Sequence, residues 1–218
     1  MTIQFEHVSF TYPQKPGRQS FTLQIEHFTP GRCTALMGEN GSGKTTLGKL
    51  AAGILRPDVG RVLYDGSDIK DWKLGEIGRR VGYLFQEPAR QIFAAHPMEE
   101  IAFPLELRGM SKEAAEEKAR ALLAEFELED VTSHTTYTLS RGEKQRLALA
   151  ALMACEPKFL VLDEPTTALD RRRRQLLSEA LHRLLASGVG MLLISHDRPF
   201  VEELGAEIRL MKGGRLDA

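Results

Sequence analysis

The stretch GENGSGKT, Gly38 to Thr45, decides how the rest of the chain is interpreted. It fits the pattern G-x-x-x-x-G-K-[ST] and lies between a short apolar segment, RCTALMG (32–38), and a helical one, TTLGKLAAGIL (45–55). A strand, a glycine-rich loop and a helix in this order are typical of a phosphate-binding loop, in which backbone N–H groups curl around a phosphate. The alternative is a plain glycine-rich turn, and the elements on either side argue against it.

The residue types of this loop suit a nucleoside triphosphate held together with Mg²⁺. Lys44 supplies a positive charge for the β- and γ-phosphates, and the Thr45 hydroxyl is a candidate magnesium ligand. The loop amides are expected to surround the phosphates because glycines let the backbone approach closely. The expected nucleotide contacts are Asn40, Gly41, Ser42, Gly43, Lys44, Thr45 and Thr46.

Two carboxylates end the apolar segment FLVLDE (159–164), which is interpreted as a buried strand. The carboxyl ends of parallel strands are where such folds place ligand contacts. An acidic turn at a strand end is the simpler interpretation, but the phosphate loop favours a division of roles. Asp163 then holds Mg²⁺, directly or through water, and Glu164 polarises an attacking water.

Two further polar residues follow apolar strands. His196 ends GMLLISH (190–196) and could donate a hydrogen bond to the γ-phosphate. Gln86 ends RRVGYLFQ (79–86), and its neutral amide could contact Mg²⁺ or the attacking water. The plainer alternatives are a turn histidine and an ordinary polar loop residue.

The segment TLSRGEKQRLALA (138–150) begins with a helix cap. Ser140 and Glu143 have the spacing of a capping box, in which each side chain bonds the other residue's backbone amide. A helix N-terminus is also an anion site, because its free N–H groups and dipole favour negative charge. The residues alone leave both interpretations open.

Composition limits the classes of function. The chain has 218 residues, a net charge of −1 and a pI near 6.6, so it lacks the basic excess of a nucleic-acid-binding protein. Cys33 and Cys155 lie far apart in apolar stretches, which suits small buried thiols in a reducing compartment. The N-terminus alternates like a strand and does not resemble a signal peptide, and the apolar runs are shorter than the ~20 residues of a membrane span.

The order of segments predicts an α/β fold with a P-loop NTPase core. Alternating segments at 2–10 and 20–28 around the turn-rich stretch 11–19 indicate an antiparallel β region, and AEIRLMKGGRL (206–216) indicates a closing hairpin. Between them RVLYDGSDI (61–69) is interpreted as one more strand of a mixed sheet. From Glu87 the signals become helical, best seen behind the expected cap Ser111. We therefore expect one domain with its core at 1–86 and 156–218 and an inserted helical subdomain at about 87–155.

Taken together, the motifs resemble those of the ATP-binding cassette (ABC) ATPases. They are the aromatic Tyr12, then GENGSGKT, Gln86, LSRGE, FLVLDE, ALD ending at Asp170, and His196, and they cover nearly the whole chain. The resemblance implies ATP binding and hydrolysis with Mg²⁺, with Tyr12 stacking on adenine. It also implies a head-to-tail dimer, in which Ser140 and the Gly142 N–H contact the γ-phosphate bound to the partner's loop. The usual signature is LSGGQ, so Arg141 and Glu143 are departures, and the partner could be a second copy or a different cassette.

The stretch after Gln86, EPARQIFAAHPMEEIAF, is similar to the energy-coupling-factor type of import ATPases. The residues that carry this similarity are Gln91, Glu99, Glu100 and Phe103. The resemblance implies a subunit that is peripheral on the cytoplasmic face of the membrane and docks a transmembrane subunit near Gln86 to Phe103. It would power uptake of a vitamin or metal ion without touching the cargo or nucleic acid.

Three alternatives stay open at this point. A chromosome or DNA-repair ATPase head shares the motifs but needs a long coiled coil, and no sustained heptads occur. A soluble translation factor would normally carry two cassettes. Arg141 prompts the third, an ATP-gated module that does not hydrolyse. The run Arg171 to Arg174 is interpreted as a solvated helix face, with an acidic partner patch as its alternative.

Overall fold

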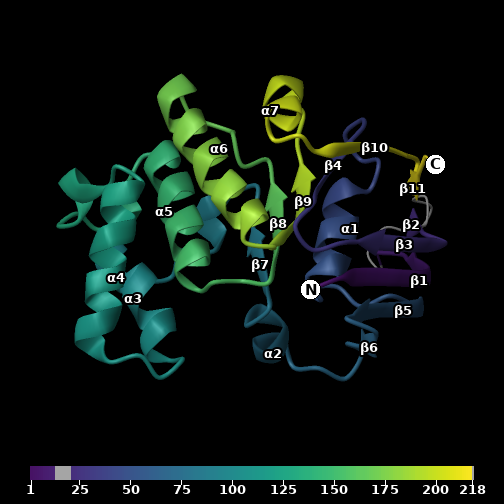
Figure 1. Ribbon diagram of the computed structural model, residues 1–218, viewed down its shortest axis with the longest axis horizontal. Helices are drawn as coiled ribbons and strands as arrows, with labels where there is room; N and C mark the ends of the chain where they lie inside the picture. The colour runs from purple at the N-terminus through teal and green to yellow at the C-terminus, as the bar shows by residue number, and fades with distance from the viewer. Residues whose placement is uncertain (13–20, 218) are drawn as a thin grey trace. The chain divides into compact units, whose positions relative to one another are not determined.

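The computed structural model describes residues 1–12 and 21–217, which form two compact units (Figure 1). The sheet unit comprises Met1–Tyr83, Lys158–Glu164 and Ser178–Ala218. The helical unit comprises Leu84–Pro157 and Pro165–Leu177. The boundaries expected from the sequence stay a prediction, and the compact helical unit also includes the segment 165–177.

An antiparallel sheet forms the first layer of the sheet unit. Its order is β2-β1-β5-β6, with β3 also paired to β1, and its strands are β1 (Ile3–Phe10), β2 (Phe21–Thr22), β3 (Ile25–Phe28), β5 (Val59–Tyr64) and β6 (Ser67–Asp68). The expected hairpin is confirmed by the antiparallel pairing of β1 with β2 and β3. Most of the turn-rich stretch 11–19 lies outside the described residues.

A bulge in β1 explains why its buried residues are at odd positions in the first half of the strand and at even positions in the second half. Ile3 and Phe5 are buried, and after the register shift between Glu6 and Ser9 the buried residues are Val8 and Phe10. His7 lies at the bulge with φ 49°. Because the extra residue moves later side chains to the other face of the strand, both halves of β1 keep apolar residues in the core.

The second sheet carries the strands that end near the phosphate loop. Its order is β11-β10-β4-β9-β8-β7, formed by β11 (Arg215–Leu216), β10 (Glu207–Lys212), β4 (Cys33–Met37), β9 (Gly190–Ile194), β8 (Phe159–Asp163) and β7 (Val81–Leu84). Strands β10, β4, β9 and β8 pair in parallel, and β10 pairs with β11 as the expected closing hairpin. All five residues of β8 and of β9 are buried, which is typical of a parallel strand covered on both faces.

Helix α1 (Lys44–Ala51) packs closely against the second sheet. A Cβ built on Gly48 would lie 3.0 Å from both Val161 Cγ1 and Ile194 Cδ1, so glycine lets the helix backbone approach the strands. The helix is shorter than the predicted segment 45–55, because Gly53 takes φ +62° soon after its last turn. Helices α2 (Leu74–Gly78) and α7 (Arg198–Glu203) complete this unit, and α6 (Arg171–Ala186) belongs partly to each unit.

The segment 61–69 differs from the single strand expected. The structure has a turn at Asp65 and Gly66, with φ 47° and 80°, and the chain folds back so that β5 pairs antiparallel with β6. Asp-Gly between apolar residues is a strong hairpin signal, because both positions of such a turn need positive φ.

Three helices dominate the helical unit: α3 (Pro97–Glu106), α4 (Lys112–Glu125) and α5 (Arg141–Ala154). A 3₁₀ turn at Pro88–Arg90 precedes α3, and two more, at Glu129–Val131 and Thr136–Thr138, lie between α4 and α5. Figure 1 shows the three helices as one group. The Ser111 side chain accepts a hydrogen bond from Ala114 N, which confirms the expected cap of α4.

The two cysteines differ in burial. Cys33 is buried, Cys155 is half-buried, and both are free thiols. In the described part of the chain, no helix combines the length and the apolar character that crossing a membrane requires.

Candidate functional site

The phosphate loop is held in place by the C-terminal hairpin. Strand β4 ends at Met37, and Gly38 follows with φ +143° beside Met211 of β10. A Cβ on Gly38 would lie well under 3.0 Å from the Met211 carbonyl oxygen. Gly214 N donates to Ser42 O at 2.8 Å, which ties the far side of the loop to the same hairpin. The hairpin therefore restricts the backbone conformation of the loop, and only glycine fits at its first position, Gly38.

Lys44 spans the inside of the loop. Its Nζ donates to Gly38 O at 2.7 Å and to Glu39 O at 2.9 Å, and the residue is 7% exposed. Desolvation lowers the pKa of this ammonium, and the nearby carboxylates of Glu164 and Asp163 oppose that shift. The loop thus encloses a positive charge and the N-terminus of α1, where an anion is favoured.

Ser42 adds a test of whether the loop fits a phosphate. Its Oγ is buried and has no hydrogen-bond partner among the described residues. A buried polar atom without a partner is uncommon, and a phosphate oxygen is a suitable acceptor for this hydroxyl. Gly41 has φ +83° and no described atom within 4 Å of its Cβ position.

Asp163 accepts two hydroxyl hydrogen bonds at one oxygen. Thr45 Oγ1 donates to Asp163 Oδ2 at 2.9 Å, and Tyr83 Oη donates to the same atom at 3.2 Å. Burial raises the pKa of Asp163, and the hydrogen bonds from Thr45 and Tyr83 act against it. A carboxylate beside a threonine hydroxyl provides the hard oxygen ligands that Mg²⁺ prefers, so these residues fit the expected metal.

Glu164 pairs with His196. The distance from Glu164 Oε1 to His196 Nε2 is 3.5 Å, and His196 N lies 3.5 Å from Glu164 Oε2. Glu164 has φ 53°, and its N–H donates to Ile194 O, which places it directly at the end of the β8–β9 pair. Burial raises the pKa of Glu164, while the His196 charge opposes that rise. A partly buried carboxylate of this kind can accept a proton from water.

Tyr12 lies beside the start of α1. Its ring meets Phe10 edge-on at a centroid distance of 4.9 Å, and its hydroxyl lies 3.4 Å from Thr46 Oγ1. The residue is 39% exposed, so it is not part of the core. An exposed aromatic ring next to a phosphate loop can stack on a base.

The capping box at the start of α5 is confirmed. Glu143 N donates to Ser140 Oγ at 3.3 Å, and Ser140 N donates to Glu143 Oε2 at 2.7 Å. Hydrogen bonds from the Ser140 side chain and from its backbone amide lower the pKa of the Glu143 carboxyl. A Cβ on Gly142 would lie 3.0 Å from Ala168 O, so this first turn also approaches another backbone closely.

Gln86 lies at the start of a loop in the helical unit. The side chains of Gln91 and Glu100 hydrogen-bond to backbone amides of this segment. Gln91 Oε1 accepts a hydrogen bond from Phe85 N at 2.9 Å. Glu100 Oε2 accepts from Phe93 N at 3.0 Å and from Ala94 N at 2.8 Å. Gln86, Ser140 and Gly142 belong to the helical unit, and their expected contacts with a nucleotide stay predictions.

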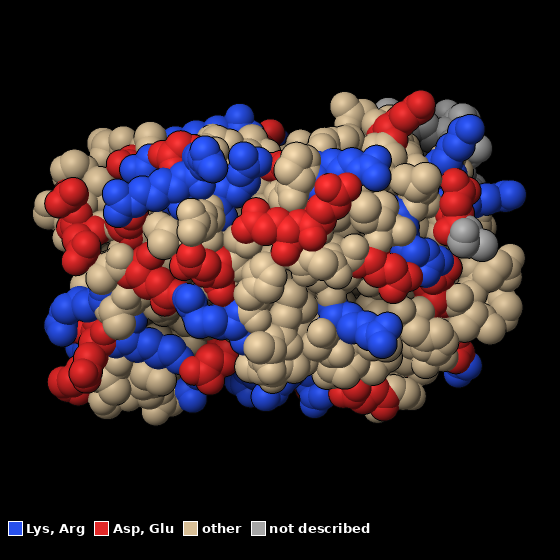
Figure 2. Space-filling view, turned by 45° about the horizontal axis from the view of Figure 1, so that its top comes forward, with Lys and Arg blue, Asp and Glu red and all other residues tan. Residues whose placement is uncertain are grey.

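The arginine run at the start of α6 is an exposed and partly paired face. Arg172 Nη2 lies 2.6 Å from Glu127 Oε1, and Arg173 Nη1 lies 2.6 Å from Asp170 Oδ2. On the face of the molecule in Figure 2, basic and acidic side chains are interspersed. Neighbouring acids, Asp170 among them, therefore offset at least two of the charges.

Comparisons with known proteins agree on one family. The family model described as "ABC transporter" matches residues 23–167. A putative ABC transporter ATP-binding protein of Pyrococcus abyssi is 39% identical over 98% of this chain and 81% of its own length. The energy-coupling factor transporter ATP-binding protein EcfA1 of Lactiplantibacillus plantarum is 36% identical over 89% of this chain and 70% of its own length.

The relatives differ in length. The chain spans only 33% of a putative ABC transporter ATP-binding protein of Methanosarcina acetivorans, to which it is 38% identical over 94% of its own residues.

Solved structures of ATP-binding cassettes share the fold. The dimeric post-hydrolysis structure of MJ0796 with ADP and Pi has a TM-score of 0.87 and 26% identity, covering 99% of this chain and 97% of that one. The cbiO1 protein of Clostridium perfringens, part of the complex cbiONQ, has a TM-score of 0.79 and 27% identity, covering 99% and 86%. The expected α/β cassette fold is therefore confirmed. The chain belongs to the ATP-binding cassette family of ATPases, which bind ATP with Mg²⁺ and hydrolyse it.

Proposed function

We propose that this chain powers uptake of a vitamin or metal ion through separate membrane subunits, as an ATPase of the energy-coupling-factor type. The similarity to EcfA1 of L. plantarum and to cbiO1 supports this type. In this proposal the chain is peripheral on the cytoplasmic face of the membrane, and it contacts neither the cargo nor nucleic acid. It works as a dimer with a second cassette, with ATP at the interface.

The proposed reaction assigns a task to each of the following candidate site residues. Lys44 and the loop amides bind the phosphates, Tyr12 stacks on the base, and His196 donates to the γ-phosphate. Thr45 and Asp163 would hold Mg²⁺, with Gln86 as a further contact, and the bound ion would neutralise charge on the β- and γ-phosphate oxygens. Glu164 accepts the proton of the attacking water. The pairing of Glu164 with His196, next to the Thr45–Asp163 hydrogen bond, is the observation that carries this assignment.

The second cassette supplies the remaining donors. Ser140 and the Gly142 N–H of one protomer contact the γ-phosphate held by its partner. A hydrogen bond to a charged group contributes ~1.5 to 3 kcal/mol, so losing two or three of them on hydrolysis amounts to several kcal/mol. That difference is enough to change a dimer from closed to open.

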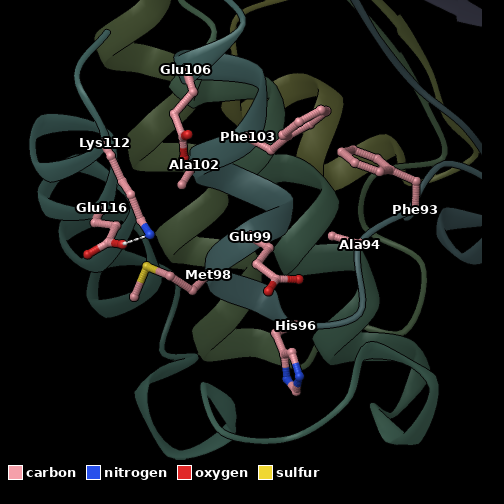
Figure 3. Close-up of a pocket in the computed structure, with 10 residues that line it drawn as sticks. All are labelled: Phe93, Ala94, His96, Met98, Glu99, Ala102, Phe103, Glu106, Lys112 and Glu116. Atoms are coloured by element: carbon pink, nitrogen blue, oxygen red, sulfur yellow. Dashed lines mark ion pairs between the residues drawn. The ribbon is translucent and has the colours of Figure 1, made fainter.

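A groove in the helical unit is the proposed docking surface for the membrane subunit (Figure 3). Its cavity measures about 580 Å³, and it lies along α3 and the loop before it. Phe93 and Phe103 are 59% and 46% exposed, and their ring centroids lie 5.7 Å apart. An exposed aromatic pair of this kind is typical of a binding surface.

The charges around the groove suggest what kind of segment it binds. The lining includes the carboxylates of Glu99, Glu106 and Glu116, and Lys112 pairs with Glu116 at 4.0 Å. The excess of carboxylates favours a cytoplasmic helix that carries an apolar side chain for the aromatic pair and a basic one for the acids.

Steady-state phosphate release with ATP and Mg²⁺ tests the catalytic part. Glu164→Gln keeps the size of the side chain but removes the base, so turnover falls by about 10² to 10⁴-fold. Lys44→Ala abolishes turnover, whereas Glu117→Gln, the same substitution at an exposed residue of α4 outside the phosphate loop, leaves it near wild type. Glu164→Gln also elutes as a dimer in sizing chromatography with ATP and Mg²⁺. Only monomer at high protein concentration would contradict the shared site.

Co-purification from solubilised membranes tests the transport part. The wild-type chain should retain integral membrane proteins, and Phe93→Asp with Phe103→Asp should lose them while keeping basal ATPase activity. Recovery of ribosomal or DNA-bound proteins alone would rule the transport assignment out.

A further inference from the structure

Tyr83 is a buried tyrosine that has no task in the reaction described above. It is the third residue of β7, the strand next to β8 in the second sheet, and it is 7% exposed. The sequence offers no reason to single it out, because an aromatic residue in an apolar strand normally serves the core.

Its ring is confined between α1 and the sheet. A Cβ built on Gly48 of α1 would lie 3.5 Å from Tyr83 Cε2, and the same position meets Val161 and Ile194 of β8 and β9 at 3.0 Å. Because helix and strands pack this closely, the ring has little freedom to turn away from its position.

The hydroxyl of this confined ring points at the carboxylate that ends β8. Tyr83 Oη donates to Asp163 Oδ2 at 3.2 Å, and Thr45 Oγ1 donates to the same oxygen at 2.9 Å. One donor comes from β7 and the other from α1. Burial raises the pKa of Tyr83, and the Asp163 charge raises it further, so the hydroxyl keeps the proton that it donates. Two donors from separate elements restrict rotation of the carboxylate about its own bond.

We propose that Tyr83 is a positioning residue for the magnesium site, whose hydroxyl fixes the orientation of the Asp163 carboxylate. The inference rests on the proposed role of Asp163 and Thr45 as the residues that hold Mg²⁺. Tyr83 itself is an outer partner that does not touch the ion. Such partners typically change metal affinity by about 10 to 100-fold when they are removed.

The test measures metal binding rather than turnover. Mn²⁺ is titrated into the protein with the slowly hydrolysed analogue ATPγS, and free Mn²⁺ is followed by electron paramagnetic resonance. Nucleotide affinity is measured separately in EDTA. Tyr83→Phe retains the ring and removes only the hydroxyl, so the fold is kept, and circular dichroism at the assay temperature verifies it. Tyr64→Phe is the matched control, because Tyr64 is also buried and donates to a backbone carbonyl, Ala51 O, at 2.6 Å.

Tyr83→Phe is expected to weaken Mn²⁺ binding about tenfold, the lower end of the range for outer partners, without changing nucleotide affinity in EDTA. Tyr64→Phe is expected to bind Mn²⁺ like wild type. In the Asp163→Asn background, Tyr83→Phe should cause no further loss. Wild-type Mn²⁺ affinity in Tyr83→Phe, or equal losses in both tyrosine variants, would overturn the inference.

The Asp163→Asn variant tests the role of Asp163 as a metal ligand separately from the positioning role of Tyr83. If it loses Mn²⁺ affinity while Tyr83→Phe does not, only the positioning role is wrong. If it binds Mn²⁺ like wild type, the assignment of Asp163 to the metal is wrong, and the role of Tyr83 is overturned with it.

Discussion

Replacing Gly38 by alanine should lower the free energy of unfolding through two additive effects at the phosphate loop. Gly38 has φ +143°, and forcing a residue with a Cβ into the left-handed region costs about 1 to 2 kcal/mol. The new Cβ would also lie under 3.0 Å from the Met211 carbonyl oxygen, a backbone atom that a side-chain rotation cannot move. Overpacking of this kind costs about 1 to 3 kcal/mol. We therefore expect the free energy of unfolding to fall by about 2 to 5 kcal/mol.

Gly66→Ala is the matched control. Gly66 has φ +80° and nothing within 4 Å of its Cβ position, so only the backbone strain of about 1 to 2 kcal/mol applies. Both changes lie in the sheet unit, which also holds Trp72, the only tryptophan of the chain, so urea unfolding can be followed by its fluorescence.

The Gly38→Ala and Gly66→Ala variants should also differ in their rates of ATP turnover. Lys44 Nζ bonds the carbonyl of Gly38, so a displaced loop misplaces the ammonium, and a shift of about 1 Å can lower turnover about 10²-fold. Gly66→Ala should turn over normally. Equal stability and equal turnover of the two variants would refute the idea that the Met211 carbonyl confines the loop.

Two further predictions concern the helical unit. Ser140→Ala and Glu143→Ala each remove one arm of the capping box and should each lower the free energy of unfolding by about 1 kcal/mol. Only Ser140→Ala should also prevent the ATP-dependent dimer in a Glu164→Gln background, as sizing chromatography would report. Burial raises the folded-state pKa of Glu100 above its ordinary value near 4.5, so its contribution to stability is present below that pH and lost as pH rises through the folded pKa. Glu100→Gln has no such dependence, so the stability of wild type relative to this variant should fall as pH rises, which urea unfolding followed by circular dichroism at several pH values would measure.

Features that depend on neighbours in sequence could be predicted from the sequence. The phosphate loop, the apolar strand ending at Asp163 and Glu164, and the cap at Ser140 each occupy a few consecutive residues with a defined local geometry. The order of these motifs along the chain matched that of a known family, and this match predicted the fold. The turn at Asp65 and Gly66 is also a local feature. The prediction of a single strand over 61–69 is wrong, because Asp-Gly between apolar residues favours a tight hairpin turn.

Features that depend on distant residues left no local pattern to detect. Tyr83 is 80 residues from Asp163 in the chain, and Met211 belongs to a strand near the C-terminus that pairs with β4. Such contacts arise only when parallel strands from separate parts of the sequence become neighbours. Glu100 is a different case, because its buried carboxylate accepts hydrogen bonds from Phe93 N and Ala94 N, which are only seven and six residues away. Its sequence context resembles an ordinary acidic helix start.

Of the two interpretations of the Ser140 segment, the capping box is confirmed and the anion site stays a prediction. A hydroxyl offers one donor and two acceptor lone pairs, and in the capping box Ser140 Oγ accepts from Glu143 N. The box engages the backbone amides of Ser140 and Glu143, and the Ser140 hydroxyl also interacts with the Glu143 carboxyl, so the Gly142 N–H is the donor of this turn that the box does not involve. The carboxylate that replaces the usual glutamine at position 143 is turned back onto Ser140, whose side chain and backbone amide both stabilise its negative charge. The box therefore does not use the Gly142 N–H, whereas the proposed contact of the Ser140 hydroxyl with a phosphate requires that hydroxyl to turn away from the Glu143 carboxyl.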